Sequence, residues 1–326
     1  MTNIIVMGGG SWGAAIAYSL GQNTAVSVTC LVRDETTASA LNNGIVPRLN
    51  DAVLPAPIQA TTATNCLADA DVIYIVLPAA ATMEALAQIE QYAAPDCPVI
   101  LCAKGLVTST NETEISPLFL PEVMNNRPAK RPFAILSGPS FADEVIQNLP
   151  AALVCASHDN AVCTAVSRQF SSSNLRIYLS DDPIGVAIGG AIKNIIALAS
   201  GICDGLGLGD NAKAALITRG LAETGRLINA LGGKKETISG LAGIGDLVLS
   251  ASGPHSRNMA YGLALGQGKA LPSSLSEGAR SAPLMATRAL ALDIEMPITN
   301  AVSKALSGEP LSALITDLLA RPTVKE

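Results

Sequence analysis

The sequence predicts an α/β protein in which an N-terminal doubly wound sheet is followed by an all-α C-terminal domain. Up to about residue 180, short apolar runs alternate with helical stretches, which is typical of repeated β–α–β units. Beyond Asp182 the strand-like runs give way to helical segments rich in Ala, Leu and Gly. The chain has 326 residues, 49% of them hydrophobic, which is more than one core usually holds. We therefore expect two domains, residues 1–181 and 182–326.

Seven apolar runs in the first part have the length of strands. The expected strands are Ile4–Met7, Val26–Val32, Val72–Leu77, Val99–Cys102, Ala134–Leu136, Ala152–Cys155 and Arg176–Leu179. Continuous apolar runs of this length indicate strands that are buried on both faces, so we expect a parallel sheet covered by helices. The expected helices between them are Ser11–Leu20, Thr82–Tyr92 and Asn160–Phe170.

The C-terminal part is expected to be helical throughout. The expected helices are Gly185–Ser200, Ala212–Leu231, Met259–Leu265, Pro283–Leu292 and Leu311–Leu319. Asp210 or Asn211 should cap the second of them after a glycine-rich loop. Residues 184–203 are apolar enough to span a membrane, but a central Lys193 is costly in lipid. A buried core helix is the better interpretation.

Composition limits the classes of partner and ligand. The formal charge of −6 is spread along the chain without a basic block, so we expect no nucleic-acid partner, whereas a small phosphate ligand needs only one Arg and a few N–H groups. Seven cysteines at irregular spacing and two histidines favour reduced thiols and no metal site. The start lacks the features of a signal peptide, and we expect a cytoplasmic protein.

A glycine motif follows the first expected strand. Gly8-Gly9-Gly10-Ser11-Trp12-Gly13 fits the pattern G-x-G-x-x-G and opens an apolar helix. In a Rossmann-type domain, Gly8 would make the tight turn, Gly10 would admit the cofactor's pyrophosphate, and Gly13 would let the helix pack against the sheet. The alternative is a plain glycine turn. The strand before the motif and the helix after it favour a dinucleotide site.

Two charged residues follow the second expected strand, where the cofactor's adenosine ribose would lie. Arg33 could hold the 2′-phosphate of NADP, whereas Asp34 could accept from the free 2′-hydroxyl of NAD. Arg33 comes first and favours NADP(H), while NAD(H) stays open. A solvated charge pair at a strand end is the alternative.

Other segments have the residue types of a site. Lys104 follows a buried strand, and Ser137–Ala142 follows the next one. Lys193 lies within an apolar helix, Asp246 follows two glycines, and Ser256-Arg257-Asn258 join a hydroxyl, a guanidinium and an amide. Each has an ordinary alternative: a lysine that reaches solvent, a strand-end charge, a helix cap or a solvated helix start. His158 and His255 have no partner that would make either a base.

With these segments in order, the sequence resembles the bacterial NAD(P)-dependent glycerol-3-phosphate dehydrogenase family over nearly its whole length. The matching segments are the G-x-G-x-W-G start, K-G at Lys104, S-G-P-S-F-A-x-E (Ser137–Glu144), G-G-A-x-K-N, N-A-x-x-A-L-I-T-R-G (Asn211–Gly220), G-x-G-D-L (Gly243–Leu247), S-R-N and E-G at Glu277. Ala14 and Ser276 depart from the residues usual in the family, and they affect only cofactor contacts.

The resemblance implies a role for each matching residue. Lys193 would exchange the proton at the C2 oxygen, and Lys104 and Asp246 would assist. The implied substrate contacts are Lys104, Gly138, Ser140, Lys193, Asp246, Ser256, Arg257 and Asn258. The implied cofactor contacts, with Gly8, Gly10 and Gly13 of the glycine motif, are Ser11, Trp12, Arg33, Lys104, Ala142, Arg257, Leu275 and Glu277. The resemblance also implies a cytoplasmic homodimer that supplies glycerol phosphate for membrane lipids.

The chemistry of these residues suits reduction of dihydroxyacetone phosphate. A general acid works best with a pKa near the working pH, and burial with a second cation nearby lowers that of a lysine. Arg257 can hold a phosphate in bidentate fashion, and Asp246 can orient Lys193 or a substrate hydroxyl. Two alternatives stay open: a dehydrogenase of similar layout acting on branched hydroxy acids, ketopantoate or opines, and a non-catalytic NAD(P)H sensor.

Overall fold

The computed structural model describes residues 1–111, 114–128, 130–251, 253, 256–273 and 276–320. The chain forms two compact units. Unit 1 comprises Met1–Val107 with Phe119–Ala187, and unit 2 comprises Thr108–Leu118 with Ile188–Glu326. The division into functional domains at 181/182 remains a prediction, and the segment 108–118 groups with the C-terminal unit.

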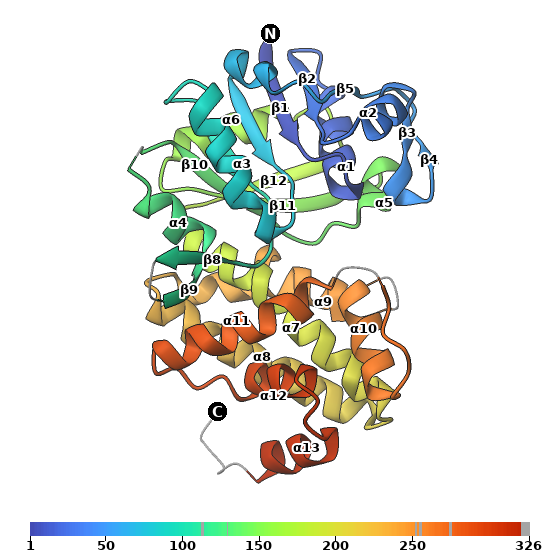
Figure 1. Cartoon of the computed structure of the whole chain (residues 1–326), viewed down its shortest axis with the longest axis vertical. Helices are drawn as coiled ribbons and strands as arrows, with labels where there is room; N and C mark the ends of the chain where they lie inside the picture. Colours follow the sequence, from blue (N-terminus) through green and yellow to red (C-terminus); the bar gives the residue numbers. More distant parts are fainter. Residues whose placement is uncertain (112–113, 129, 252, 254–255, 274–275, 321–326) are drawn as a thin grey trace. The chain divides into compact units, whose positions relative to one another are not determined.

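Unit 1 is built on an eight-stranded sheet (Figure 1). In spatial order its strands are β12 (Leu175–Ser180), β11 (Ala151–Ala156), β10 (Phe133–Ser137), β7 (Val99–Leu101), β6 (Val72–Ile75), β1 (Thr2–Met7), β2 (Val26–Leu31) and β5 (Gln59–Thr61). All seven expected strands are confirmed, and the short edge strand β5 is additional. From β5 to β10 the strands follow the order 3-2-1-4-5-6 of a dinucleotide-binding sheet. The predicted doubly wound fold is therefore confirmed.

The expectation of an all-parallel sheet is wrong at one position. β10 and β11 pair antiparallel, with Leu136 opposite Cys155, whereas β11 and β12 pair parallel to each other. Between β10 and β11 the chain forms only the five-residue helix α5 (Ala142–Ile146), which is too short to carry the chain back as a crossover helix does. The chain therefore reverses, and antiparallel strands at the edge of such sheets are common.

Both faces of the sheet are buried, which explains why its strands read as continuous apolar runs. Successive strand residues point to opposite faces. On one face, residues such as Ile4, Tyr74 and Ile100 pack against helices. The helices that contribute to this core are α1 (Ser11–Gly21), α2 (Glu35–Asn42), α5 and α6 (Asn160–Gln169). The alternate residues, among them Ile5 and Ile73, are equally buried.

Unit 1 also contains α3 (Ala79–Tyr92), α4 (Leu120–Asn126), the 3₁₀ turns η1 (Pro47–Leu49) and η2 (Thr64–Asp69), and a small hairpin of β3 (Ile45–Val46) and β4 (Ala52–Val53). A second two-stranded sheet pairs β8 (Leu106–Asn111) with β9 (Glu114–Phe119), and most of both strands belongs to unit 2. The sequence did not predict these short elements apart from α3.

The C-terminal part of unit 2 is helical, as predicted (Figure 1). Its elements are α7 (Pro183–Gly205, which begins in unit 1), α8 (Gly209–Ala230), η3 (Lys235–Ser239), η4 (Leu241–Gly245), α9 (Asp246–Ala251), α10 (Arg257–Gly266), α11 (Glu277–Ala291), α12 (Pro297–Leu306) and α13 (Leu311–Leu319). The predicted cap of α8 is wrong: the N-cap is Leu208, and Asp210 lies in the first turn. In the first turn its negative charge interacts favourably with the helix dipole, but its side chain does not cap the helix.

Helix α7 is the apolar segment that the sequence singled out. By length and composition it could cross a membrane, but 94% of its most apolar window is buried inside the protein. Its burial is that of a core helix.

Glycines let α7 and α10 pack unusually closely. A Cβ on Gly201 would lie 2.1 Å from the carbonyl oxygen of Met259, and one on Gly262 would lie 2.0 Å from that of Leu198. Real Cβ atoms do not approach so closely, so a side chain at either position would force the helices apart. The crossing fixes α10 against the part of α7 that follows Lys193.

The seven cysteines are all unpaired thiols. Six are buried and only Cys66, in η2, is partly exposed. Burial raises the pKa of both Cys30 and Cys102 to about 12, so these thiols stay protonated and act as small apolar side chains.

Candidate active site

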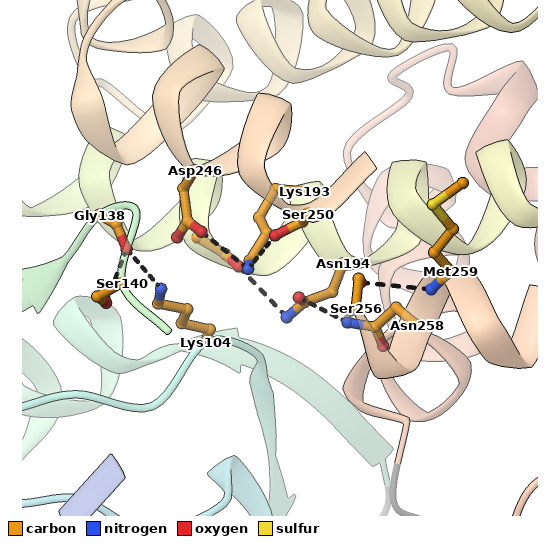
Figure 2. Close-up of polar contacts among 11 residues, drawn as sticks. Lys104, Gly138, Ser140, Lys193, Asn194, Asp246, Ser250, Ser256, Asn258 and Met259 are labelled. Atoms are coloured by element: carbon orange, nitrogen blue, oxygen red, sulfur yellow. Dashed lines mark hydrogen bonds and ion pairs between the residues drawn. The ribbon is translucent and has the colours of Figure 1, made fainter. Parts of the chain in front are cut away.

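Lys193 forms a buried ion pair on α7 (Figure 2). Its Nζ lies 2.9 Å from Oδ1 of Asp246, and the two side chains are 12% and 2% exposed. Nζ also donates to Oγ of Ser250, at 2.7 Å. Because Asp246 and Ser250 are four residues apart on α9, both point from one helix face toward the ammonium. The carboxylate balances the charge, and the two acceptors fix its direction.

The approach of α9 to Lys193 depends on two glycines. Gly189 lies four residues before Lys193, on the same face of α7. A Cβ on Gly189 would be 2.7 Å from the carbonyl oxygen of Ala242, and one on Gly243 would be 2.1 Å from that of Ile238. The segment Leu241–Gly245 is a single π-helical turn, a feature often found at functional sites. The glycines in the two motifs therefore place Asp246 against the lysine.

A second polar network joins three helices of unit 2, and Figure 2 shows its bond between Asn258 and Asn194. Nδ2 of Asn258 donates to Oδ1 of Asn194 at 2.9 Å, which connects α10 to α7. Oδ1 of Asn258 accepts from Oγ of Ser276 and from the backbone N–H of Gly278, both at 2.9 Å. Asn258 therefore holds the start of α11 in place, and its predicted substrate contact remains a prediction.

The other predicted residues of unit 2 lie at helix N-termini. Ser256 caps α10 by accepting from the N–H of Met259, and Arg257 follows with an exposed side chain. Glu277 begins α11 and is partly exposed. Burial raises its pKa, an effect that the charges of Arg280 and Arg257 partly oppose. The predicted cofactor contact Leu275, like His255, lies outside the described residues.

The glycine turn of unit 1 has the shape that a pyrophosphate requires. Gly8 has a φ of +125°, and a Cβ on it would lie 2.4 Å from the carbonyl oxygen of Val76. A Cβ on Gly13 would lie 1.8 Å from the oxygen of Gly8, so only glycine allows α1 to begin here. At Gly10, by contrast, a Cβ would point into nearly open space. No side chain caps α1, and its first N–H groups are available for an anion.

Ser11 and Trp12 occupy the first turn of α1. Oγ of Ser11 donates to the backbone oxygen of Arg48, at 2.7 Å. Trp12 is partly buried and packs against the apolar core of the sheet. The residues of this turn therefore fit a dinucleotide cofactor, with the phosphates at the N–H groups of α1.

Arg33 and Asp34 differ in their contacts within the protein. Arg33 follows β2 with an exposed side chain, whereas Asp34 is the N-cap of α2. Oδ1 of Asp34 accepts from the N–H of Thr37 at 2.7 Å, and Oδ2 accepts from its hydroxyl at 3.0 Å. These bonds hold the pKa of the Asp34 carboxyl below its usual value. The carboxylate is thus engaged by its own helix.

A third cluster lies at the ends of β7 and β10 (Figure 2). Nζ of the half-buried Lys104 donates to the carbonyl oxygen of Gly138 at 3.0 Å, and Oγ of Ser140 donates to the same oxygen at 3.3 Å. Gly138 has a φ of +140°, a conformation that favours glycine at this position. Ala142 begins α5 and packs against the core.

Sequence reasoning did not assign roles to Ser250, Asn194 or Ser276. Serine is common in loops and helices, so Ser250 gives no signal by itself. Its spacing of four residues from Asp246 was the available clue. Asn194 is part of the motif G-G-A-x-K-N, and its partner Asn258 is distant in sequence.

Sequence comparison places the chain among known enzymes. Two protein-family models match the chain. The model for the N-terminus of NAD-dependent glycerol-3-phosphate dehydrogenase matches residues 3–163, and the model for its C-terminus matches residues 182–315. The chain belongs to the glycerol-3-phosphate dehydrogenase family. It is therefore an oxidoreductase of a family that uses NAD or NADP, and the resemblance carried by the motifs is confirmed.

Curated relatives and solved structures agree with the family. The chain is 43% identical to the glycerol-3-phosphate dehydrogenase [NAD(P)+] of Bradyrhizobium sp., over 98% of this chain and 96% of the relative. It is 40% identical to that of Mesorhizobium japonicum, over 99% and 93%. The crystal structure of glycerol-3-phosphate dehydrogenase from Coxiella burnetii superposes with a TM-score of 0.88 at 34% identity, covering 98% of this chain and 99% of that one.

A ketopantoate reductase from Ralstonia eutropha shares the fold alone, with a TM-score of 0.60 at 14% identity and coverage of 94% and 97%. The ketopantoate alternative is therefore supported by a shared fold only, whereas the family match supports glycerol-3-phosphate dehydrogenase. Among the described residues, no group of three or more His, Cys, Asp or Glu side chains is arranged to hold a metal ion.

Proposed function

We propose that this chain interconverts sn-glycerol 3-phosphate and dihydroxyacetone phosphate, with Lys193 as the general acid and base. The proposal rests on the ion pair of Lys193 with Asp246, in a chain whose family acts in this reaction. A bound nicotinamide cofactor supplies or accepts the hydride at C2. The contribution of the protein is to hold the substrate, exclude water and move one proton.

In the direction of reduction, Lys193 donates a proton to the C2 oxygen of dihydroxyacetone phosphate as that oxygen becomes negative. The side chain is held by Asp246 and Ser250, so it is oriented before the substrate arrives and little reorganisation is needed. In the oxidation of glycerol 3-phosphate, the neutral amine takes the proton back from the C2 hydroxyl. Asp246 stabilises the ammonium in both directions.

The remaining substrate contacts stay predictions that follow from the motifs. Arg257 is exposed at the start of α10 and can offer two parallel N–H donors to a phosphate. The predicted contacts of Lys104, Gly138, Ser140, Ser256 and Asn258 can each be tested by substitution.

NADP(H) is the proposed preferred cofactor. The exposed Arg33 can pair with a 2′-phosphate, whereas Asp34 is engaged by Thr37 as a helix cap and is poorly placed to accept from a free 2′-hydroxyl. The homodimer and the cytoplasmic location are further proposals that rest on the family resemblance. Light scattering of the purified protein gives its mass, and twice the mass of one chain is the expected result.

The decisive experiment follows the absorbance of NADPH, and separately of NADH, after dihydroxyacetone phosphate is added to the purified protein. Rapid oxidation with a higher kcat/KM for NADPH is expected, and ketopantoate serves as the control substrate. Lys193→Met should lose at least about 10²-fold in kcat with unchanged cofactor affinity. Normal turnover in this variant would show that Lys193 is not the general acid and base. Oxidation of the cofactor with ketopantoate but not with dihydroxyacetone phosphate would show that the proposed substrate is wrong.

A further inference from the structure

Arg48 lies directly beside the glycine turn, although it belongs to none of the motifs. A Cβ placed on Gly10 would lie 3.8 Å from Cδ of Arg48 and within 4 Å of no other neighbouring atom. The aliphatic part of Arg48 therefore borders the open space above Gly10, where the backbone is bare. The guanidinium, which extends beyond Cδ, is on an exposed side chain.

The backbone at Arg48 is held in place. Oγ of Ser11 donates to its carbonyl oxygen at 2.7 Å, which fastens η1 to the first turn of α1. The next residue, Leu49, packs against the apolar core of the sheet. Asn50 and Asp51 then adopt positive φ angles of 53° and 55°, which turn the chain away. The structure thus fixes the origin of the side chain and leaves its end free to meet a ligand.

Arg48 and Arg33 are arginines with exposed side chains near the glycine turn. Thr37 is the main cause of the low pKa of Asp34, and the charges of Arg33 and Arg48 both contribute. The geometry of the turn agrees: a Cβ on Gly9, the residue before Gly10, would lie 2.6 Å from Cγ1 of Val32 and 2.8 Å from Cγ2 of Thr37, so the turn beside Arg48 packs against the end of β2 that leads to Arg33. Among the described residues neither forms an ion pair with a carboxylate, and Asp34 itself is held by Thr37. Two unpaired guanidiniums near one point favour an anion with more than one charge.

We propose that Arg48 is a second binding residue for the 2′-phosphate of NADP(H), forming a two-guanidinium clamp with Arg33. The proposal rests on the cofactor preference proposed above and assigns part of it to Arg48. The pyrophosphate already has the free N–H groups of α1, so it has less need of the arginine. The 2′-phosphate has no such donors and depends on side chains.

The test measures binding of two nucleotide fragments to the full-length protein by calorimetry, without turnover. 2′,5′-ADP carries the 2′-phosphate, and 5′-AMP lacks it. Arg48→Ala should weaken binding of 2′,5′-ADP by about 10- to 100-fold, the usual loss for a charge-assisted hydrogen bond, and change that of 5′-AMP by less than about twofold. Arg168→Ala, which removes an exposed arginine on α6, is the matched control.

An equal loss for both fragments would overturn the proposal, because Arg48 would then act on the shared part of the nucleotide or on the fold. An unchanged affinity for 2′,5′-ADP would overturn it as well. In kinetics with dihydroxyacetone phosphate, the same variant should raise KM for NADPH about tenfold or more while KM for NADH stays within twofold. If the wild-type protein binds 2′,5′-ADP but turns over no substrate, the proposed reaction fails while the assignment of Arg48 stands.

Discussion

Asp246 and Lys193 form an ion pair of 2.9 Å that is almost completely withdrawn from solvent. A charge buried in this way is stable only with its partner, so the pair constrains both the chemistry and the stability of unit 2. The consequences for the two can be separated by substitution.

Asp246→Asn should reduce kcat by about 10²-fold, because the amide cannot balance or orient the ammonium of Lys193. It should also lower the free energy of unfolding by about 3 kcal/mol, since the lysine remains buried without its counter-charge. Steady-state kinetics and urea unfolding measure the two effects. Asp210→Asn, at an exposed carboxylate of α8, should leave kcat unchanged and lower the free energy of unfolding by less than about 1 kcal/mol.

The double variant Lys193→Met with Asp246→Leu separates stability from function. Replacing both partners of a buried pair by apolar groups is often neutral or stabilising, so unfolding should return close to that of the wild type. Turnover should remain lost. A double variant as active as the wild type would show that the pair has only a structural role.

Gly13→Ala should abolish high-affinity cofactor binding. The added methyl group would lie 1.8 Å from the carbonyl oxygen of Gly8, so α1 would have to move away from the turn. We expect the Kd for NADPH to rise at least about tenfold, as measured by fluorescence titration. Gly21→Ala, at the other end of α1 where a Cβ meets nothing within 4 Å, is the control. Equal affinities in the two variants would contradict the role of this turn.

Gly262→Ala should destabilise unit 2 by about 1–3 kcal/mol or more, because the methyl group would overlap the backbone of α7 at Leu198. The displacement of α10 should also disturb the bond between Asn258 and Asn194 and reduce activity. Thermal unfolding and kcat/KM measure the two effects. A variant with wild-type stability would mean that the crossing of the two helices is not tight.

Glu223 predicts a particular dependence of stability on pH. It accepts from the N–H groups of Ile298 and Thr299 at the start of α12, yet burial raises its pKa from 4.5 to about 7. Because the folded pKa is the higher one, the contribution of Glu223 to stability is complete below pH 4.5. It falls as the pH rises to 7 and is constant above that, a loss of about 3 kcal/mol.

The comparison of the wild type with Glu223→Gln isolates this effect, because other titrating groups cancel in the difference. The free energy of unfolding of the wild type should fall relative to the variant between pH 4.5 and 7. A difference that rises over this range would mean that the hydrogen bonds outweigh burial and that the pKa is lowered.

The sequence was most informative where apolar periodicity and glycine motifs act together. Strands such as Val72–Ile75 are buried on both faces and therefore read as continuous apolar runs. β5 escaped notice because it has only three residues, two of them polar, and forms an edge strand. The reversal between β10 and β11 could not be predicted either, since pairing direction depends on where the chain returns and not on strand composition.

For the candidate site, the motifs identified Lys193 and Asp246, but not what holds them together. Ser250 carries no distinctive signal, and the packing of Gly189 against Ala242 appears only in three dimensions. Asp34 illustrates the opposite case: its position after β2 suggested a ribose contact, whereas its spacing from Thr37 is that of a helix cap. The cap is a consequence of local backbone chemistry, and a ribose contact of Asp34 remains untested.

Because six of the seven thiols are buried, the protein has one cysteine that is suited to labelling with a spectroscopic probe. A maleimide dye reacts with thiolates that it can reach, and Cys66 is the one partly exposed thiol. The wild-type chain should thus accept a single fluorophore on η2 without any engineering of its cysteines. Such a label would lie in unit 1, so fluorescence anisotropy could follow its local motion while nucleotide is titrated.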